Sequence, residues 1–183
     1  MGELTIEAAR HILSRPGYKP EVCIETGTRN GNSAKVWATL LSEVHTIEIR
    51  KEPYLKAIKN NTLKNIHFYH GDSSKVLPKL IKRFQQPVLF YLDAHRSRTG
   101  GKYNGFPIWN ELEAIKRRNF GDIVAIDDVH AFGRKKKSGG ASTWDGLTVE
   151  TITKYLRSRI KEIKVFDDCC TAWLEPREEK NVL

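Results

Sequence analysis

Short apolar segments alternate with helix-like segments along most of this chain, and this alternation is what most restricts its possible folds. The segments that resemble strands are Val22–Glu25, Val44–Ile49, Ile66–His70, Val88–Leu92 and Ile123–Ile126. Amphipathic patterns between them predict helices over Ser33–Leu41, Pro53–Asn60, Ser74–Phe84 and Ile108–Arg118. Pro78 is compatible with the third of these helices only if it lies in the first turn. Repeated strand–helix–strand order predicts a parallel sheet with helices on both faces.

The two ends of the chain complete this architecture. A helix is expected over Thr5–Leu13, and another near Leu147–Arg159. The strands Ile163–Asp167 and Thr171–Leu174 are separated by only a few residues, so they should pair antiparallel. We therefore expect an α/β fold with a doubly wound, mostly parallel seven-stranded sheet that ends in an antiparallel hairpin. One domain should span 1–183, with an N-terminal helix in 1–18, a core over 19–177 and a tail over 178–183.

Composition excludes some classes and leaves others open. No apolar run in the 183 residues approaches the ~18–20 needed to cross a bilayer, and no secretory signal is apparent. The three cysteines form neither a disulfide framework nor a zinc pattern, so we expect a cytoplasmic protein without a membrane partner. The net charge of +9 is compatible with nucleic acid, an anionic small substrate or a solubilising surface.

The segment Glu25-Thr-Gly-Thr-Arg-Asn-Gly31 follows the first predicted strand and precedes a helix. Glycines at such a turn let the backbone bend sharply and approach a ligand, while the start of the helix offers unpaired N–H groups. The carboxylate of Glu25 would repel a pyrophosphate but could accept hydrogen bonds from an ammonium group. This favours S-adenosylmethionine (SAM) over a dinucleotide, and the glycine spacing also differs from that of NAD-binding motifs.

An acid follows or ends each of the five predicted parallel strands, at the edge of the sheet where ligands collect. Glu48 lies 23 residues after Glu25, where an acid can bind both ribose hydroxyls, although a salt bridge to Arg50 or Lys51 is the alternative. Asp72 or Ser73 could contact an adenine, or Asp72 could simply cap the following helix.

These motifs resemble those of the class I SAM-dependent methyltransferases over roughly residues 19–177. Glu25–Gly31 resembles the family's first motif, Thr46-Ile-Glu-Ile49 its strand-two acid, and His70-Gly-Asp-Ser-Ser74 its third motif. The resemblance implies a cofactor site for SAM at Glu25, Thr26, Gly27, Thr28, Arg29, Gly31, Asn32, Ser33, Glu48, Ile49, Gly71, Asp72, Ser73 and Asp93.

Within that family, Tyr91-Leu-Asp-Ala-His95 and Ile126-Asp-Asp-Val129 are similar to metal-assisted O-methyltransferases of the macrocin and catechol type. The resemblance implies that Asp93, Asp127 and Asp128 hold a divalent cation such as Mg²⁺, for which carboxylate oxygens are suitable ligands. If the strand continued past Ile126, however, Asp127 and Asp128 would face opposite ways and only one could reach the site.

His95 and Asp93 are the candidate catalytic residues, with His95 as the preferred general base. His130 is a weaker candidate for the base, and both histidines follow acids at the strand ends. The other four histidines, His11, His45, His67 and His70, fall where packed or surface side chains are expected. Trp144 could form an apolar wall for the acceptor. The basic residues Arg96, Arg98, Lys102 and Arg134–Lys137 favour a small acceptor that carries phosphate or carboxylate.

The most direct interpretation is a SAM-dependent O-methyltransferase that acts on a small, anionic acceptor. The loops around the site are short and can cover little of a substrate. A homodimer is therefore possible, in which a second subunit helps to enclose the substrate. An RNA ribose methyltransferase is an alternative suggested by the charge, although motifs for methylating base amines are missing. A non-catalytic module that binds SAM or a nucleotide is the other alternative.

Overall fold

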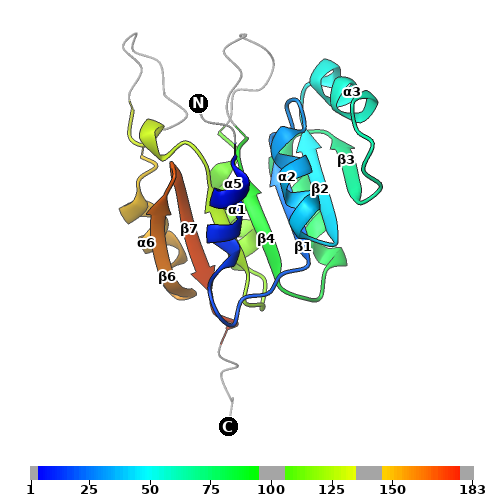
Figure 1. Ribbon diagram of the computed structural model, residues 1–183. Helices are drawn as coiled ribbons and strands as arrows, with labels where there is room; N and C mark the ends of the chain where they lie inside the picture. The colour runs from blue at the N-terminus through cyan, green and yellow to red at the C-terminus, as the bar shows by residue number, and fades with distance from the viewer. Residues whose placement is uncertain (1–3, 95–105, 135–145, 178–183) are drawn as a thin grey trace.

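The computed structural model describes residues 4–94, 106–134 and 146–177, and its centre is a seven-stranded sheet (Figure 1). The strands are β1 (Val22–Thr26), β2 (Glu43–Glu48), β3 (Ile66–His70), β4 (Val88–Leu92), β5 (Ile123–Ile126), β6 (Ile160–Phe166) and β7 (Cys169–Leu174). Their order across the sheet is β3-β2-β1-β4-β5-β7-β6. The first five strands are parallel, whereas β7 pairs antiparallel with both β5 and β6. The predicted seven-stranded fold and its terminal hairpin are confirmed.

The strand order reverses between β1 and β4, which are neighbours in the sheet although two strands separate them in the chain. Connections from these two strands therefore leave toward opposite sides, and the carboxyl ends diverge to leave space for a ligand. We call this edge, where the five parallel strands end, the carboxyl rim.

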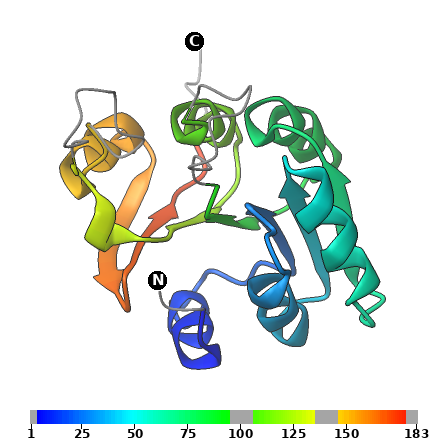
Figure 2. The same ribbon diagram turned by 90° about the horizontal axis from the view of Figure 1, so that it is seen from above.

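Helices cover both faces of the sheet (Figure 2). They are α1 (Ile6–Leu13), α2 (Asn32–Leu40), α3 (Lys51–Lys59), α4 (Ser73–Leu80), α5 (Ile108–Lys116) and α6 (Val149–Leu156), with short 3-10 turns η1 (Ile81–Arg83) and η2 (Val129–Ala131). One apolar core lies under α1 and α2, and a second lies under α4, α5 and α6. Within the described ranges, no helix is both long and apolar enough to cross a lipid bilayer.

The helix around Pro78 differs from the sequence prediction. Pro78 was considered compatible with this helix only in the first turn, but α4 begins at Ser73, so the proline is its sixth residue. Asp72 caps the helix there, since its side chain accepts a hydrogen bond from the Ser74 N–H, and this cap sets the start of the helix. Pro78 consequently leaves the Ser74 carbonyl without an intrahelical donor, and the helix tightens into η1 only three residues later.

Candidate cofactor and active site

The glycine turn brings the ends of three strands together. Gly27 has a φ of +93°, and its N–H donates to the Ile47 carbonyl at 2.9 Å. A Cβ at this position would lie 2.4 Å from the backbone oxygen of Asp93, so only glycine fits between β1 and β4. Gly31 also has a positive φ of +76° and precedes Asn32, the first residue of α2. The turn thus exposes the start of α2 to the carboxyl rim, as the motif predicted.

Glu25 is fully buried beneath this turn. Its Oε2 accepts a hydrogen bond from the Thr46 hydroxyl, which also contacts the Thr28 hydroxyl. Its Oε1 is buried and makes no hydrogen bond with any residue that the structure describes. Burial raises the pKa of Glu25 to about 8, although the nearby hydroxyls of Ser33 and Thr46 oppose the increase. The site therefore contains a buried carboxyl oxygen that lacks a donor.

Thr46 was not among the predicted site residues. It lies directly opposite Glu25 in the register of β1 and β2, and it is fully buried. In the sequence it appeared only as the first residue of the Thr46–Ile49 motif, which by itself does not reveal its partner.

Glu48 joins the loops that follow β1 and β2. Its Oε2 accepts from the Arg29 N–H at 2.8 Å, and its Oε1 accepts from the Arg50 N–H at 2.9 Å. The Arg50 guanidinium is 3.4 Å from the same Oε1, so the salt bridge considered as an alternative is present. Oε1 thus already accepts two hydrogen bonds from Arg50, whereas Oε2 can accept one more. These contacts are therefore compatible with ribose binding. Ile49, the next residue, is half-buried.

At the end of β3, Gly71 follows the strand and Ser73 is buried. The Gly71 N–H donates to the backbone oxygen of Glu48 at 2.9 Å, which fixes this loop to the end of β2. The Oδ1 of Asp72 accepts from both the N–H and the hydroxyl of Ser74. The capping role considered for Asp72 is therefore real.

Asp93 and Asp127 follow the neighbouring strands β4 and β5 and influence each other electrostatically. Burial, with Asp93 nearby, raises the pKa of Asp127 to about 7, while a hydrogen bond from the Tyr91 hydroxyl opposes the increase. Asp93 also contributes to the raised pKa of Glu25. It therefore lies between the acid of β1 and the acid of β5. Tyr91, which the sequence did not single out, lies buried among these acids.

Asp127 and Asp128 are not on a regular strand, because β5 ends at Ile126. Asp128 has a φ of +59°, which turns the chain into η2, so the alternation that would have placed the two side chains on opposite faces does not apply. Asp128 is buried, and its Oδ1 is 3.9 Å from His130 Nδ1.

The turn between β6 and β7 also reaches the carboxyl rim. The carboxylate of Asp168 accepts hydrogen bonds from the backbone N–H of His130, at 2.7 Å, and pairs with its imidazole Nδ1. Ligand atoms of Asp128, His130 and Asp168 lie within 4.8 Å of one another, whereas Asp93, Asp127 and Asp128 do not form such a cluster in the part of the chain that the structure describes. Asp168 was missed because its contact with His130 spans 38 residues.

Several predicted residues lie outside the described ranges. These are the candidate base His95, Trp144, and the basic residues Arg96, Arg98, Lys102 and Lys135–Lys137. Arg134 is described and exposed.

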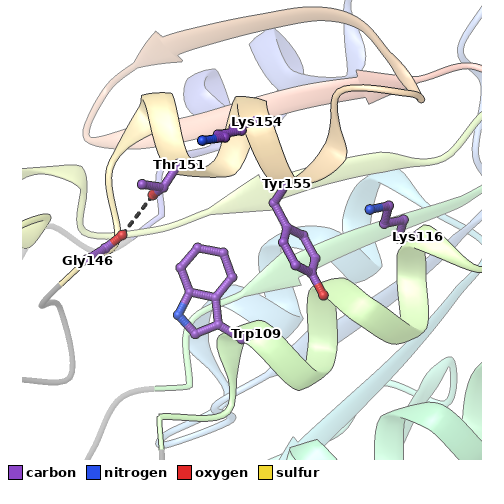
Figure 3. Close-up of a pocket in the computed structure, with 6 residues that line it drawn as sticks. All are labelled: Trp109, Lys116, Gly146, Thr151, Lys154 and Tyr155. Atoms are coloured by element: carbon purple, nitrogen blue, oxygen red, sulfur yellow. Dashed lines mark hydrogen bonds between the residues drawn. The ribbon is translucent and has the colours of Figure 1, made fainter.

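A groove of about 400 Å³ lies between α5 and α6 (Figure 3). Its lining residues are Trp109, Lys116, Gly146, Thr151, Lys154 and Tyr155, and none of these is a rim acid. The rings of Trp109 and Tyr155 meet edge to face with centroids 5.3 Å apart, and Lys116 Nζ is 4.8 Å from the Tyr155 ring centre. The groove is therefore aromatic and basic, and distinct from the predicted cofactor site.

Neither the family models nor the curated proteins contain a match to this sequence. Solved structures do match. One is a candidate methyltransferase of Streptococcus mutans, SMU.1697c, in complex with S-adenosylhomocysteine (SAH), with a TM-score of 0.61 and 12% identity over 95% of this chain and 99% of that one. Another is a candidate caffeoyl-CoA O-methyltransferase of Staphylococcus aureus, with a TM-score of 0.62 and 14% identity over 96% and 84% of the two chains.

The chain has the fold of the SAM-dependent methyltransferases. The methyltransferase MycE of mycinamycin biosynthesis, solved with Mg, SAH and mycinamycin VI, has the same fold, with a TM-score of 0.61 and 15% identity. The match covers 97% of this chain but 50% of MycE, so the chain corresponds to about half of that protein. The methyltransferase fold predicted from the motifs is thus confirmed, whereas the type of reaction depends on the residues at the rim.

The rim can be compared with the two groups that the motifs predicted, SAM and a divalent cation. The buried Oε1 of Glu25, which accepts no hydrogen bond from the described residues, suits a ligand that brings an ammonium group, and Gly27 lets the turn that holds this oxygen pack against the backbone after β4. The repelling carboxyls of Asp93 and Asp127 offer hard oxygen donors, and a divalent cation would relieve their repulsion.

Proposed function

We propose that this chain is a SAM-dependent methyltransferase that methylates a hydroxyl oxygen of a small, anionic acceptor with the help of a divalent cation. The observation that carries the proposal is the convergence at one switch point of the Gly27 turn, the donorless buried oxygen of Glu25 and the acid pair Asp93 and Asp127.

The first three strand ends are proposed to bind SAM. Residues 25–33 surround the methionine moiety, where the Glu25 carboxyl accepts from the ammonium and the start of α2 offers N–H groups. Glu48, already oriented by the backbone of Arg29 and Arg50, accepts from the ribose hydroxyls. Asp72 and Ser73 border the adenine. Because these side chains are fixed by the fold, little ordering is needed when the cofactor binds.

The ends of β4 and β5 are proposed to bind the acceptor. Asp93, Asp127 and Asp128 would hold the divalent cation, which when bound lowers the pKa of a hydroxyl in contact with it. His95 is the proposed base for the proton of that hydroxyl. The basic residues that follow the two strands, from Arg96 to Lys102 and from Arg134 to Lys137, favour an acceptor with a negative charge.

Calorimetry tests both halves of the proposal. SAH should bind wild-type protein with one-to-one stoichiometry, and Mg²⁺ should bind the SAH complex of the wild type but not that of Asp127→Ala. Glu113→Ala removes an acid on the exposed surface of α5 and serves as the control. Failure of SAH to bind would overturn the cofactor assignment. If chelation and Asp127→Ala both leave methyl transfer unchanged, the cation has no role in the reaction, but the protein would still be a methyltransferase.

An RNA ribose methyltransferase is the second candidate, favoured by the net charge of +9. RNA that neutralises several lysines and arginines on binding releases counterions, so its affinity should fall steeply with salt. Salt-independent activity on a small anion would argue against both RNA and charge steering. SAH binding without methyl transfer to any acceptor, with or without Mg²⁺, would instead indicate a binding module.

A further inference from the structure

Two histidines and a glutamate meet at the opposite edge of the sheet from the carboxyl rim. Glu43 and His45 are two residues apart at the start of β2, so their side chains lie on the same face of the sheet. His67 on β3 is directly opposite His45 in the strand register. From the sequence alone we expected an ordinary packed or surface role for these histidines. The sequence does not show that β2 pairs with β3, and this pairing places the two histidines side by side.

The three ligand atoms converge. Glu43 Oε1 is 2.9 Å from His45 Nε2 and 3.2 Å from His67 Nε2, and all three atoms lie within 4.8 Å of one another. The two imidazoles are stacked with centroids 4.8 Å apart. Ligands bound to Zn²⁺ at about 2.0–2.1 Å in a tetrahedron are about 3.3–3.4 Å apart, so the observed separations are close to those of a metal site.

The buried nitrogen of His45 lacks a suitable donor or acceptor. Although His45 Nε2 is close to Glu43, it has no partner with hydrogen-bond geometry among the described residues, and the whole side chain is inaccessible to solvent. A buried imidazole nitrogen without a hydrogen-bond partner is available to a metal ion.

A second layer of side chains orients this imidazole. His45 Nδ1 is 2.9 Å from the Tyr69 hydroxyl, which accepts a hydrogen bond from Arg83 at 3.0 Å. When Nδ1 carries the proton and donates it to Tyr69, Nε2 presents its lone pair to Glu43 and His67. Metal-binding histidines are typically held in this way through their second nitrogen.

We propose that Glu43, His45 and His67 form a site for a transition metal of the Zn²⁺ class, separate from the rim. Two imidazole nitrogens and one carboxylate suit Zn²⁺, whereas Mg²⁺ prefers oxygen ligands alone. The side chains of Glu43 and His67 are 37% and 46% exposed, so water can reach the open coordination position. The positive charge of Arg83 lies behind Tyr69 and weakens the site, while Glu43 offsets it. The metal would join β2 to the edge strand β3.

Titration of chelator-treated full-length protein with Zn²⁺, and with Co²⁺ as a spectroscopic probe, tests the site. Wild type should bind one Zn²⁺ that excess Mg²⁺ does not displace, show a Co²⁺ visible spectrum typical of nitrogen ligation, and gain thermal stability on binding. His67→Ala and Glu43→Gln alter an exposed and a partly exposed position, and each should weaken binding by more than about 100-fold, since removing a ligand should exceed the ~10- to 100-fold effect of losing an outer partner. Tyr69→Phe should weaken it by about 10-fold.

The matched control is His11→Ala, which removes an imidazole from α1 and should leave Zn²⁺ binding unchanged. The proposal is overturned if wild type shows no saturable one-to-one binding, or if binding persists in both His67→Ala and Glu43→Gln. SAH binding should be the same in all of these variants, so the outcome is independent of the proposed methyltransferase function.

Discussion

The carboxyl group of Glu25 is fully buried at the end of β1, and this burial determines which protonation state the folded protein prefers. Its folded pKa is about 8, whereas glutamate in an unfolded chain ionises near about 4.3. Between these values the folded protein holds a proton that the unfolded chain has released. The contribution of Glu25 to stability is therefore complete at low pH and is lost as the pH rises toward about 8.

Glu25→Gln should remove this dependence, because glutamine stays neutral and keeps a similar shape. In urea unfolding between pH 5 and 8, the wild type should lose up to about 1.4 kcal/mol per pH unit relative to Glu25→Gln. Glu52→Gln, at an exposed position of α3, is the control and should run parallel to the wild type. Parallel curves for wild type and Glu25→Gln would contradict a buried, protonated Glu25.

Contacts between elements decide which glycines the fold requires. Gly27 and Gly17 have similar φ values of +93° and +87°, but only Gly27 is packed against another strand. A Cβ at Gly27 would collide with the backbone after β4, whereas a Cβ at Gly17 meets no atom within 4 Å. Substitutions at Gly17 and Gly27 therefore distinguish the free-energy cost of backbone strain from the cost of a steric clash with a neighbouring strand.

Gly17→Ala should destabilise the protein by about 1–2 kcal/mol, the cost of a left-handed residue with a side chain, and leave SAH affinity unchanged. Gly27→Ala should cost more and abolish SAH binding, because the β1–α2 turn must move away from β4. Urea unfolding and calorimetry measure the two effects. Equal behaviour of the two variants would show that packing against Asp93 has no consequence.

The N-terminal caps of α1 and α4 allow a similar comparison. Thr5 and Asp72 both accept a hydrogen bond from a backbone N–H of the first turn, but only Asp72 is at the carboxyl rim. Asp72→Ala and Thr5→Ala should each lose about 1 kcal/mol of stability. Only Asp72→Ala should also weaken SAH binding, by about 10- to 100-fold for a lost charged hydrogen bond. Unchanged SAH affinity in Asp72→Ala would restrict this residue to capping.

For the molecule as a whole, a buried ion pair connects η1, the segment after η1 and the start of β4 within the core under α4, α5 and α6. Arg118 donates to the carboxylate of Asp122 at 2.9 Å and to the backbone carbonyls of Ile81, Phe84 and Gln86. Asp122 also accepts from the Val88 N–H at the start of β4. Both side chains are almost completely buried, so removing one leaves the other charge without compensation.

Arg118→Met should therefore destabilise the protein by about 3–5 kcal/mol. The neighbouring Arg117 is exposed and pairs with Glu113 four residues earlier, so Arg117→Met should cost no more than about 1 kcal/mol. Chemical denaturation measures both, and the SAH affinity of the folded fraction should not change in either. Similar losses in the two variants would mean that the buried network contributes little.

The sequence by itself determined the order of the elements, the terminal hairpin, and the placement of Glu25, Glu48, Asp72, Asp93 and Asp127 at the ends of five strands. These features follow from periodicities of two and about 3.6 residues and from glycine turns, which are properties of neighbouring residues. Helix bounds were less certain, since α4 runs over Ser73–Leu80 where the pattern predicted Ser74–Phe84.

Only the tertiary structure decided which of these residues touch. Thr46 meets Glu25 across 21 residues, Asp168 meets His130 across 38, and His67 lies opposite His45 through strand register. The protonation of Glu25 depends in the same way on how completely other elements cover it. Such contacts are set by the packing of segments distant in the chain, and no local pattern encodes a distance between them.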